Sequence, residues 1–235
     1  MIPAMIEQPM PDCPLCPRLV EYRRANEAAN PGWFNAPVPS WGSEDAPFLV
    51  VGMAPGVRGA NRTGRPFTGD HAGVLLYETL ILHGLATGRY EACPDDGMAL
   101  LRTRVINAVR CVPPANLPTP AEVRTCNAYL RAELLGMPRL RVALALGVLA
   151  HAAVLRASGL PASRVKFRHG AFHDLPGGLV LANSYHVSRY NTNTGLLTAP
   201  MFEAVIAGVV ARLEPGRVRL LDLSDDMSAK TKSGA

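Results

Sequence analysis

The sequence predicts an α/β fold: a three-layer α/β/α sandwich around a central four-stranded parallel sheet. Four short apolar runs rich in β-branched residues lack polar alternation, as strands buried on both faces of a parallel sheet do. Segments with helical apolar spacing lie between these runs, and this order predicts βαβ units. With 235 residues, of which 48% are hydrophobic, the chain can build the core of one compact domain.

The individual elements follow from these patterns in order. The expected strands cover residues 48–51, 104–109, 141–146 and 179–182. The expected helices cover residues 72–83, 121–135, 148–157 and 200–213. Thr119, Pro120 and Glu122 form a capping-box pattern, which places Cys126 on the second turn of its helix. We expect a single domain at residues 13–215, a disordered N-terminus at 1–12 and a C-terminal tail at 216–235.

Hydropathy and charge narrow the class of protein. No apolar run approaches the roughly 18–20 residues that span a bilayer. The first residues lack the basic and apolar regions of a signal peptide, so we expect a monomeric cytoplasmic protein that does not contact membranes. The 24 basic and 19 acidic residues give a net charge of +5, which is compatible with a polyanionic partner without identifying one.

Four of the five cysteines have a spacing typical of a metal site; they are Cys13, Cys16, Cys111 and Cys126. The first two form a C-x2-C pair in a proline-rich segment, residues 11–17, that we expect to be a non-helical loop. In a reducing compartment four such thiols indicate a metal rather than disulfides. Zinc and an iron–sulfur cluster both accept four thiolates, and the spacing does not distinguish them. Cys93 is expected to be a free loop thiol.

Polar and glycine-rich segments follow three of the predicted strands, at residues 52–70, 111–116 and 183–191. Ligands of parallel sheets bind at this carboxyl edge, so the three segments are candidates for a common site. Gly59 and Gly64 have the spacing that opens a phosphate-binding P-loop. Arg65 and Pro66 stand where that motif requires lysine and serine or threonine, which argues against mononucleotide binding.

Four residues in or beside these segments have both a structural and a functional interpretation. Asp70 precedes a predicted helix, where a carboxylate caps the backbone and can also polarise water or stabilise a cation. Phe67 is either a loop residue folded onto the core or a stacking platform. His186, among small polar residues and arginine, is better explained as a ligand-contacting group. Asn107 lies inside a strand, where its amide needs a partner such as the edge of a base.

The loops and the cysteine array together resemble the iron–sulfur uracil-DNA glycosylases. The first motif of that family is similar to Gly-x-Ala-Pro-Gly at residues 52–56, followed by Asn-Arg-Thr-Gly-Arg-Pro-Phe-Thr-Gly-Asp at residues 61–70. The second is similar to Ser-Tyr-His-Val-Ser-Arg-Tyr-Asn-Thr-Asn-Thr-Gly at residues 184–195. Met53 stands where family 4 has a carboxylate, and Asp70 matches the aspartate that ends this loop in family 5 (UDGb-type).

This resemblance implies a monofunctional DNA repair glycosylase that flips uracil out of DNA and hydrolyses its N-glycosidic bond. Hypoxanthine and xanthine are further implied substrates, and the implied partner is double-stranded or single-stranded DNA with deaminated bases. The implied cofactor is a [4Fe-4S] cluster on the four spaced cysteines. The implied catalytic residues are Asp70, His186 and Asn116; the base contacts are Gly52, Met53, Ala54, Phe67 and Asn107; the phosphate contacts are Arg62, Arg65, Ser188 and Arg189.

Val187 replaces the proline that is usual after the histidine of the second motif, so we expect a less rigid loop at this point. Three other functions stay open at the level of the sequence. The apolar side chain of Met53 is compatible with a non-catalytic iron–sulfur module that binds DNA. A family 4-type uracil-specific glycosylase and a zinc-stabilised α/β hydrolase are the other two.

Overall fold

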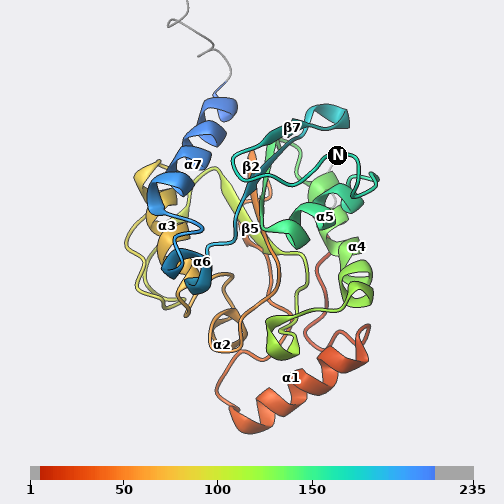
Figure 1. Ribbon diagram of the computed structural model, residues 1–235. Coiled ribbons are helices and arrows are strands. Elements are labelled where there is room, and N and C mark those ends of the chain that lie inside the picture. Colours follow the sequence, from red (N-terminus) through yellow and green to blue (C-terminus); the bar gives the residue numbers. More distant parts are fainter. Residues whose placement is uncertain (1–5, 215–235) are drawn as a thin grey trace, which may run out of the picture.

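A six-stranded sheet forms the centre of the computed structural model, which describes residues 6–214 (Figure 1). The strand order is β1-β5-β2-β6-β8-β7. The four inner strands are parallel and correspond to the predicted ones: β5 (Thr103–Asn107), β2 (Phe48–Gly52), β6 (Val142–Leu146) and β8 (Val180–Ser184). The predicted parallel core of an α/β sandwich is therefore confirmed.

Two antiparallel edge strands extend this core and were not predicted. These strands are β1 (Trp41–Gly42), which pairs with β5, and β7 (Phe172–Asp174), which pairs with β8. At two and three residues they are too short to show a periodic pattern. A separate two-stranded sheet joins β3 (Ala86–Thr87) to β4 (Ala99–Leu100).

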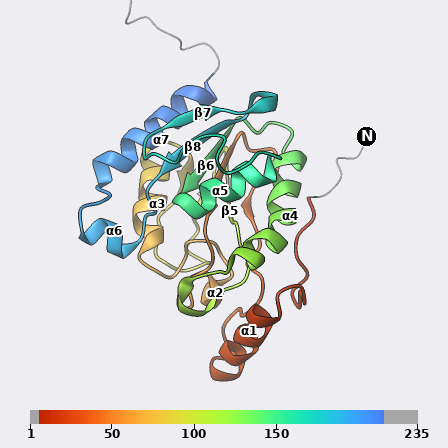
Figure 2. The same cartoon turned by 45° about the vertical axis from the view of Figure 1, so that its right-hand side comes forward.

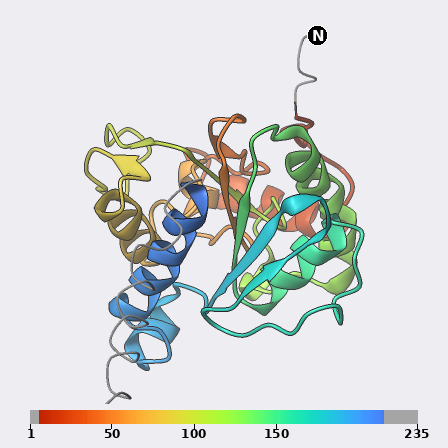
Figure 3. The ribbon, with the colours of Figure 1, turned by 90° about the horizontal axis from the view of Figure 1, so that it is seen from above.

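Helices cover both faces of the sheet (Figures 1 and 3). One layer contains α3 (Ala72–Leu82) and α7 (Ala199–Leu213), and the other contains α4 (Pro120–Gly136) and α5 (Val148–Ala157). Val50 belongs to the core cluster under the first layer, whereas its neighbours Leu49 and Val51 belong to the cluster under the second. Both faces of the strand are thus buried, which explains why the strands carry no polar alternation.

The predicted helix start at residue 120 is confirmed in detail. The Thr119 hydroxyl accepts the backbone N–H of Glu122 at 3.3 Å, and the Glu122 carboxylate accepts the N–H of Thr119 at 2.7 Å. These reciprocal bonds satisfy two donors at the helix terminus and fix where α4 begins, and therefore where Cys126 lies. Within residues 6–214, no helix is long and apolar enough to span a bilayer.

The N-terminal segment differs from its prediction in two respects. Pro17 begins helix α1 (Pro17–Ala29) instead of belonging to a non-helical loop. Proline fits the first helical position because the backbone N–H that it lacks would have no hydrogen-bond partner within the helix. Residues 6–12 were expected to be disordered, yet Ile6 is buried and Gln8 donates to Glu133 at 2.8 Å. Residues 1–5 and the predicted tail at 216–235 lie outside the described residues.

The loops that leave the carboxyl ends of the parallel strands gather at one edge of the sheet. They contain the short helices α2 (Ala60–Thr63) after β2 and α6 (Arg189–Asn193) after β8. In Figure 2, α2 lies below the strand labels and α6 lies at the left side of the molecule. The parallel pairing of β2 with β6 and of β6 with β8 therefore brings two loops that are distant in sequence to the same edge.

Candidate active site

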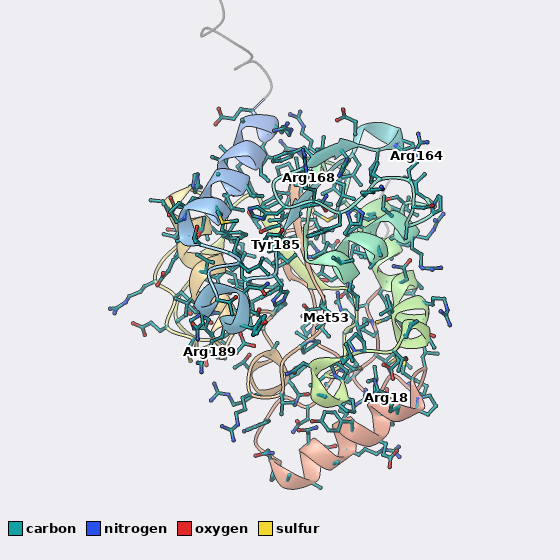
Figure 4. All side chains as sticks on the ribbon, in the orientation of Figure 1. Arg18, Met53, Arg164, Arg168, Tyr185 and Arg189 are labelled. Carbon is teal, nitrogen blue, oxygen red and sulfur yellow. The ribbon has the colours of Figure 1, made fainter. Side chains whose placement is uncertain are left out.

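A pocket of about 770 Å³ opens at this carboxyl edge. Its walls come from the loops after β2, β6 and β8 and from the segment after β5. Seven of the residues that the sequence predicted line it: Met53, Ala54, Asp70, Asn116, His186, Ser188 and Arg189. Figure 4 shows Met53 and Arg189 near the lower edge of the sheet, above α1. The two motif loops thus form one site.

Asp70 lies two residues before α3, whose N-cap position is His71, and its side chain still accepts a backbone N–H of the first helical turn. Its Oδ1 atom accepts the backbone N–H of Ala72 at 3.1 Å. Burial raises the pKa of Asp70 above its ordinary value of 3.8, whereas hydrogen bonds from the N–H groups of Ala72 and Gly73 act in the opposite direction. The carboxylate is therefore fixed in orientation and partly withdrawn from water, as a catalytic carboxylate requires.

The end of β2 packs tightly between two of the predicted base-contacting residues. A β-carbon at Gly52 would lie 2.4 Å from both the Asn107 Oδ1 atom and the Phe67 Cζ atom, so only glycine fits there. Phe67 has a positive φ of 52°, an uncommon conformation that its backbone bond from the Tyr90 hydroxyl, 3.0 Å long, helps to hold. Such a conformation in a loop beside a pocket is typical of functional sites.

Phe67 and Asn107 lie behind the pocket wall, with 7% and 4% of their surface exposed, and Gly52 lies between them. The Phe67 ring is 6.2 Å from the His186 ring, centroid to centroid, at an angle of 32°. The Asn107 amide makes no hydrogen bond with any other residue in the described range 6–214. A buried amide of this kind is available to a ligand that reaches the floor of the pocket.

His186 follows β8 and is held by residues that come after it. The Val187 side chain is fully buried in the core, and the Asn191 amide donates to the His186 carbonyl at 2.8 Å. The loop is thus anchored despite the absence of proline at position 187. Burial lowers the pKa of His186 from 6.5 to about 4, so its imidazole is neutral at physiological pH. A neutral imidazole can donate one hydrogen bond without carrying a charge.

The pocket-lining residues that were not singled out from the sequence include Arg58, His71 and Gly147. The His71 Nε2 atom lies 3.1 Å from the Thr192 hydroxyl, so it connects the first motif loop to α6 of the second. Arg58 lies in the gap between the two halves of the first motif, and His71 directly follows its last residue. Proximity to Asp70 was the one available signal for His71, but no pattern in the sequence shows the bond to Thr192.

The predicted phosphate contacts divide into two groups. Arg189 and Ser188 line the pocket, although the Ser188 hydroxyl also caps α6 by accepting the N–H of Asn191. Arg62 is exposed, and its guanidinium donates to the carbonyls of Arg58 and Gly69, so it lies beside the pocket without lining it.

The prediction for Arg65 is wrong, because this side chain is buried and already paired. It donates to both carboxylate oxygens of Asp96, at 2.8 and 2.6 Å, and to the Thr68 hydroxyl at 2.7 Å. Its guanidinium also lies 4.7 Å from the centre of the Trp41 ring. With 6% of its surface exposed, Arg65 cannot meet a phosphate and instead holds the loop in place.

Asn116 is exposed at the mouth of the pocket, in the short 3₁₀ turn η1 (Pro114–Asn116). Both Ala115 and Asn116 have a φ of 55°, and consecutive residues in this region are uncommon outside glycine. The turn directs the chain back toward α4. The structure therefore places Asn116 with Asp70 and His186, as the sequence predicted.

The four spaced cysteines line a second pocket, on the side of the molecule that carries α1: Cys13, Cys16, Cys111 and Cys126. Arg23 donates to the Cys111 sulfur at 3.4 Å, and the backbone N–H of Arg110 donates to the Cys126 sulfur at 3.3 Å. Such donors stabilise thiolates. Among residues 6–214 no three cysteine, histidine or acidic side chains converge on the position of a single metal ion. Cys93 is exposed and does not line this pocket, as expected.

The chemistry of the four thiols limits which metal group this pocket would hold. Burial raises the pKa of Cys111 to about 11 and that of Cys126 to about 12, so these sulfurs need a cationic partner to be thiolates at neutral pH. The donor set is all sulfur, which suits zinc or an iron–sulfur cluster. A cluster spreads its four ligands over several irons and does not require them to meet at one point.

Comparisons with known proteins find similar sequences over most of the chain. A family model described as the uracil DNA glycosylase superfamily matches residues 39–209. A type-5 uracil-DNA glycosylase of Thermus thermophilus is 46% identical over 204 residues, which cover 85% of this chain and 93% of the relative. That of Pyrobaculum aerophilum is 41% identical and covers 85% and 88%. A type-4 uracil-DNA glycosylase of the same organism is 32% identical over 155 residues, or 66% and 65%.

Proposed function

Because this chain belongs to the uracil-DNA glycosylase superfamily, in its type-5 branch, we propose that it removes uracil from DNA by hydrolysing the N-glycosidic bond. The observation that carries the proposal is the convergence of Asp70 and His186 on one pocket at the carboxyl edge of the sheet. A base inside a duplex cannot reach such a pocket, so the nucleotide has to flip out of the helix first.

The two side chains suit the charges that develop during the reaction. Cleavage of the glycosidic bond produces a sugar with cationic character and an anionic base. The Asp70 carboxylate would stabilise the sugar or orient the attacking water, and Asn116 at the pocket mouth would assist. The neutral imidazole of His186 would donate a hydrogen bond to the carbonyl that gains negative charge. Phe67 would stack on the base, and the free amide of Asn107 would face its pyrimidine edge.

The proposal includes hypoxanthine and xanthine as further substrates. Met53 and Ala54 give the pocket wall an apolar surface at the position where a polar partner would select one base. A wall without a fixed hydrogen-bond donor rejects a different base less strongly than a polar wall does. We therefore expect several deaminated bases to be released, with uracil among them.

The reaction is proposed to be monofunctional, without strand cleavage. A glycosylase that also cleaves the strand as a lyase needs an amine that forms a Schiff base with the sugar. Within residues 6–214 the sequence has a single lysine, Lys166, and it does not line the pocket. Water is then the nucleophile, and the product is an intact strand with an abasic site. The proposed partner is double-stranded DNA that contains deaminated bases, bound by a monomer.

We further propose that Cys13, Cys16, Cys111 and Cys126 hold a [4Fe-4S] cluster. When bound, the cluster would connect the N-terminal segment, the segment after β5 and helix α4, from which its ligands come. Its role is then structural, and no step of hydrolysis passes through it. The buried sulfurs and the N–H donors beside them support this assignment.

A base-release assay tests the proposed function. Purified protein is incubated with duplex oligonucleotides that contain uracil, hypoxanthine or xanthine opposite each normal base, and free base and strand integrity are measured separately. Free uracil together with an intact abasic strand supports the proposal. Binding without release would indicate a non-catalytic DNA-binding module, and strand cleavage without added base would contradict the monofunctional mechanism.

A further inference from the structure

A row of basic side chains lies outside the pocket and outside both motif loops. Arg164, Lys166 and Arg168 are exposed, and the residues that alternate with them, Val165 and Phe167, are partly buried. We call these three basic residues the basic ladder. The backbone N–H of Arg164 closes a turn by donating to the Pro161 carbonyl at 2.9 Å. After this turn exposed and partly buried residues alternate, so Lys166 and Arg168 both face solvent.

The inward residues of this segment attach it to helix α5 and to Tyr185, the residue directly before His186. The Phe167 ring lies 5.7 Å from the His151 ring and 6.1 Å from the Tyr185 ring, between centroids. His169 stacks on Tyr185 at 4.8 Å with an angle of 10°, and its Nδ1 atom accepts the backbone N–H of Tyr185 at 3.1 Å. The ladder is therefore held in position relative to the residue that precedes His186.

The basic ladder runs from the outer edge of the molecule toward the side that carries the pocket. In Figure 4, Arg168 and Tyr185 lie between Arg164, at the outer edge, and Arg189, at the pocket. The carbonyl of Asn183 accepts the N–H of Gly170 at 2.9 Å, which joins the end of the segment to β8 directly. A polyanion that enters the pocket beside Arg189 can therefore extend along this face of the molecule.

The ladder side chains have no role in holding the fold together. Across the described range 6–214, none of the three makes a side-chain hydrogen bond or an ion pair. Arg65 and Arg104, by contrast, are each paired with a buried carboxylate. Three unpaired cations in a row raise the local positive potential and favour a partner with regularly spaced negative charges.

We propose that the basic ladder binds the phosphates of the DNA that flanks the flipped nucleotide, and so extends the DNA interface beyond the motif loops. The inference rests on the proposed function for the presence of DNA at the pocket. A DNA strand offers one phosphate per nucleotide, so a row of cations can contact successive phosphates without reading any base. The ladder contributes to affinity in this way and leaves the chemistry in the pocket unchanged.

The test compares two variants that lose the same charge. In the first, Arg164, Lys166 and Arg168 are all replaced by glutamine. In the second, the same change is made at Arg102, Arg139 and Arg141, three exposed arginines that line a groove at the opposite, amino edge of the sheet. Thermal melting checks that both are folded. Fluorescence anisotropy then measures the affinity for an undamaged duplex over a range of salt concentrations.

The ladder variant is expected to bind about 10–100-fold more weakly than the wild type at low salt. The slope of log K against log salt should become shallower by about two to three, because each phosphate contact contributes about 0.9. The amino-edge variant should keep the wild-type slope. On a uracil duplex, the single-turnover rate at saturating enzyme should be unchanged, while the enzyme concentration needed for half-saturation rises.

Equal slopes for the two variants would overturn the proposal and show that the ladder does not contact DNA. A lower saturating rate in the folded ladder variant would also overturn it, since the ladder would then act on the pocket. If the wild type binds DNA but releases no uracil, the proposed function fails. The anisotropy comparison still decides the role of the ladder in that case, because it uses undamaged DNA and requires no cleavage.

Discussion

The carboxylate of Asp70 occupies the space that a side chain at position 59 would need. A β-carbon on Gly59 would lie 2.2 Å from the Asp70 Oδ2 atom and 2.8 Å from its Cγ atom. A β-carbon on Gly56 would also come within 2.8 Å of Oδ2. The two glycines of the first motif loop thus form the surface against which the carboxylate rests, and they set its position by having no side chains.

The substitution Gly59→Ala should therefore reduce catalysis by moving Asp70. A displacement of about 1 Å in a catalytic group costs on the order of 100-fold in rate. Single-turnover release of uracil measures the effect, and DNA binding should stay close to the wild-type value. Gly32→Ala is the matched control, because a β-carbon at Gly32 meets nothing within 4 Å. Equal rates for the two variants would show that the carboxylate adapts to the added methyl group.

Asp70→Asn should abolish the charge but preserve the fold. Asparagine caps a helix about as well as aspartate, so the bond to the Ala72 N–H is kept and the melting temperature should hardly change. Loss of the charge should slow cleavage by about 100-fold. A near wild-type rate would mean that Asp70 is only a helix cap.

The pH dependence gives a second readout for Asp70. Burial raises its pKa above 3.8, and the ionised form is the active one. The cleavage rate of the wild type should therefore fall as the pH is lowered toward this raised pKa, and at higher pH, where Asp70 stays ionised, its titration should no longer change the rate. The Asp70→Asn variant should lack this acid limb. A rate profile with the same acid limb in both proteins would assign the limb to another group.

The lowered pKa of His186 predicts how the free energy of unfolding depends on pH. Its pKa is about 4 in the folded protein, and we take the ordinary value of 6.5 for the unfolded chain. Between these two values the unfolded chain binds a proton that the folded protein does not bind. The free energy of unfolding should therefore fall as the pH falls from 6.5 to 4, and this group has no effect above that window.

The variant His186→Gln removes this titration. Its melting temperature should decrease less than that of the wild type between neutral pH and about pH 5. Uracil release should be slower by about 10–100-fold at neutral pH, since a hydrogen bond to the departing base is lost. Parallel loss of stability with pH in the two proteins would show that the imidazole is not desolvated.

Cysteine substitutions test the second pocket. Cys111→Ser should remove the brown visible absorbance of a bound iron–sulfur cluster and reduce solubility, because Cys111 is buried among the other three cysteines. Cys93→Ser should change neither property, because Cys93 is exposed and lies outside that pocket. Iron and sulfide analysis of both proteins provides the measurement. A colourless wild type that contains one zinc ion would contradict the cluster.

The two arginines Arg65 and Arg189 should respond in opposite ways. Arg65→Gln leaves the Asp96 carboxylate without its partner, at a cost of about 3 kcal/mol in the free energy of unfolding. Arg189→Ala should leave the melting temperature unchanged and make the salt slope of DNA binding shallower by about one. Chemical denaturation and anisotropy measure the two effects. If Arg189→Ala lost uracil and kept hypoxanthine, Arg189 would contact the base rather than a phosphate.

Position along the chain was enough to predict the parallel core and seven of the residues that line the pocket. Residues directly after buried parallel strands meet at one edge, so Asp70 and His186 could be placed together without coordinates. The capping box at Thr119 was equally visible, since both of its bonds are local. The short strands β1 and β7 could not be predicted, because two or three residues are too few to show a periodic hydrophobic pattern.

The role of Arg65 could not be predicted, for a different reason. Its partner Asp96 lies in a polar segment beyond α3, and nothing in the sequence shows that the two side chains meet. Arg62 and Arg65 are both arginines of the same loop, yet Arg62 is exposed and Arg65 is buried. Burial of a long charged side chain depends on tertiary contacts such as the one with Trp41, which no local pattern records.

The strand order has a consequence for how the protein is made. Asp70 and His186 come together only when β6 has inserted between β2 and β8, and all of these pairings join distant parts of the chain. Contacts of high sequence separation form slowly in folding. A nascent chain that has emerged only as far as β6 contains Asp70 but has no pocket. Competence for base removal should thus arise late in synthesis, after β8 and the loop that carries His186 have left the ribosome.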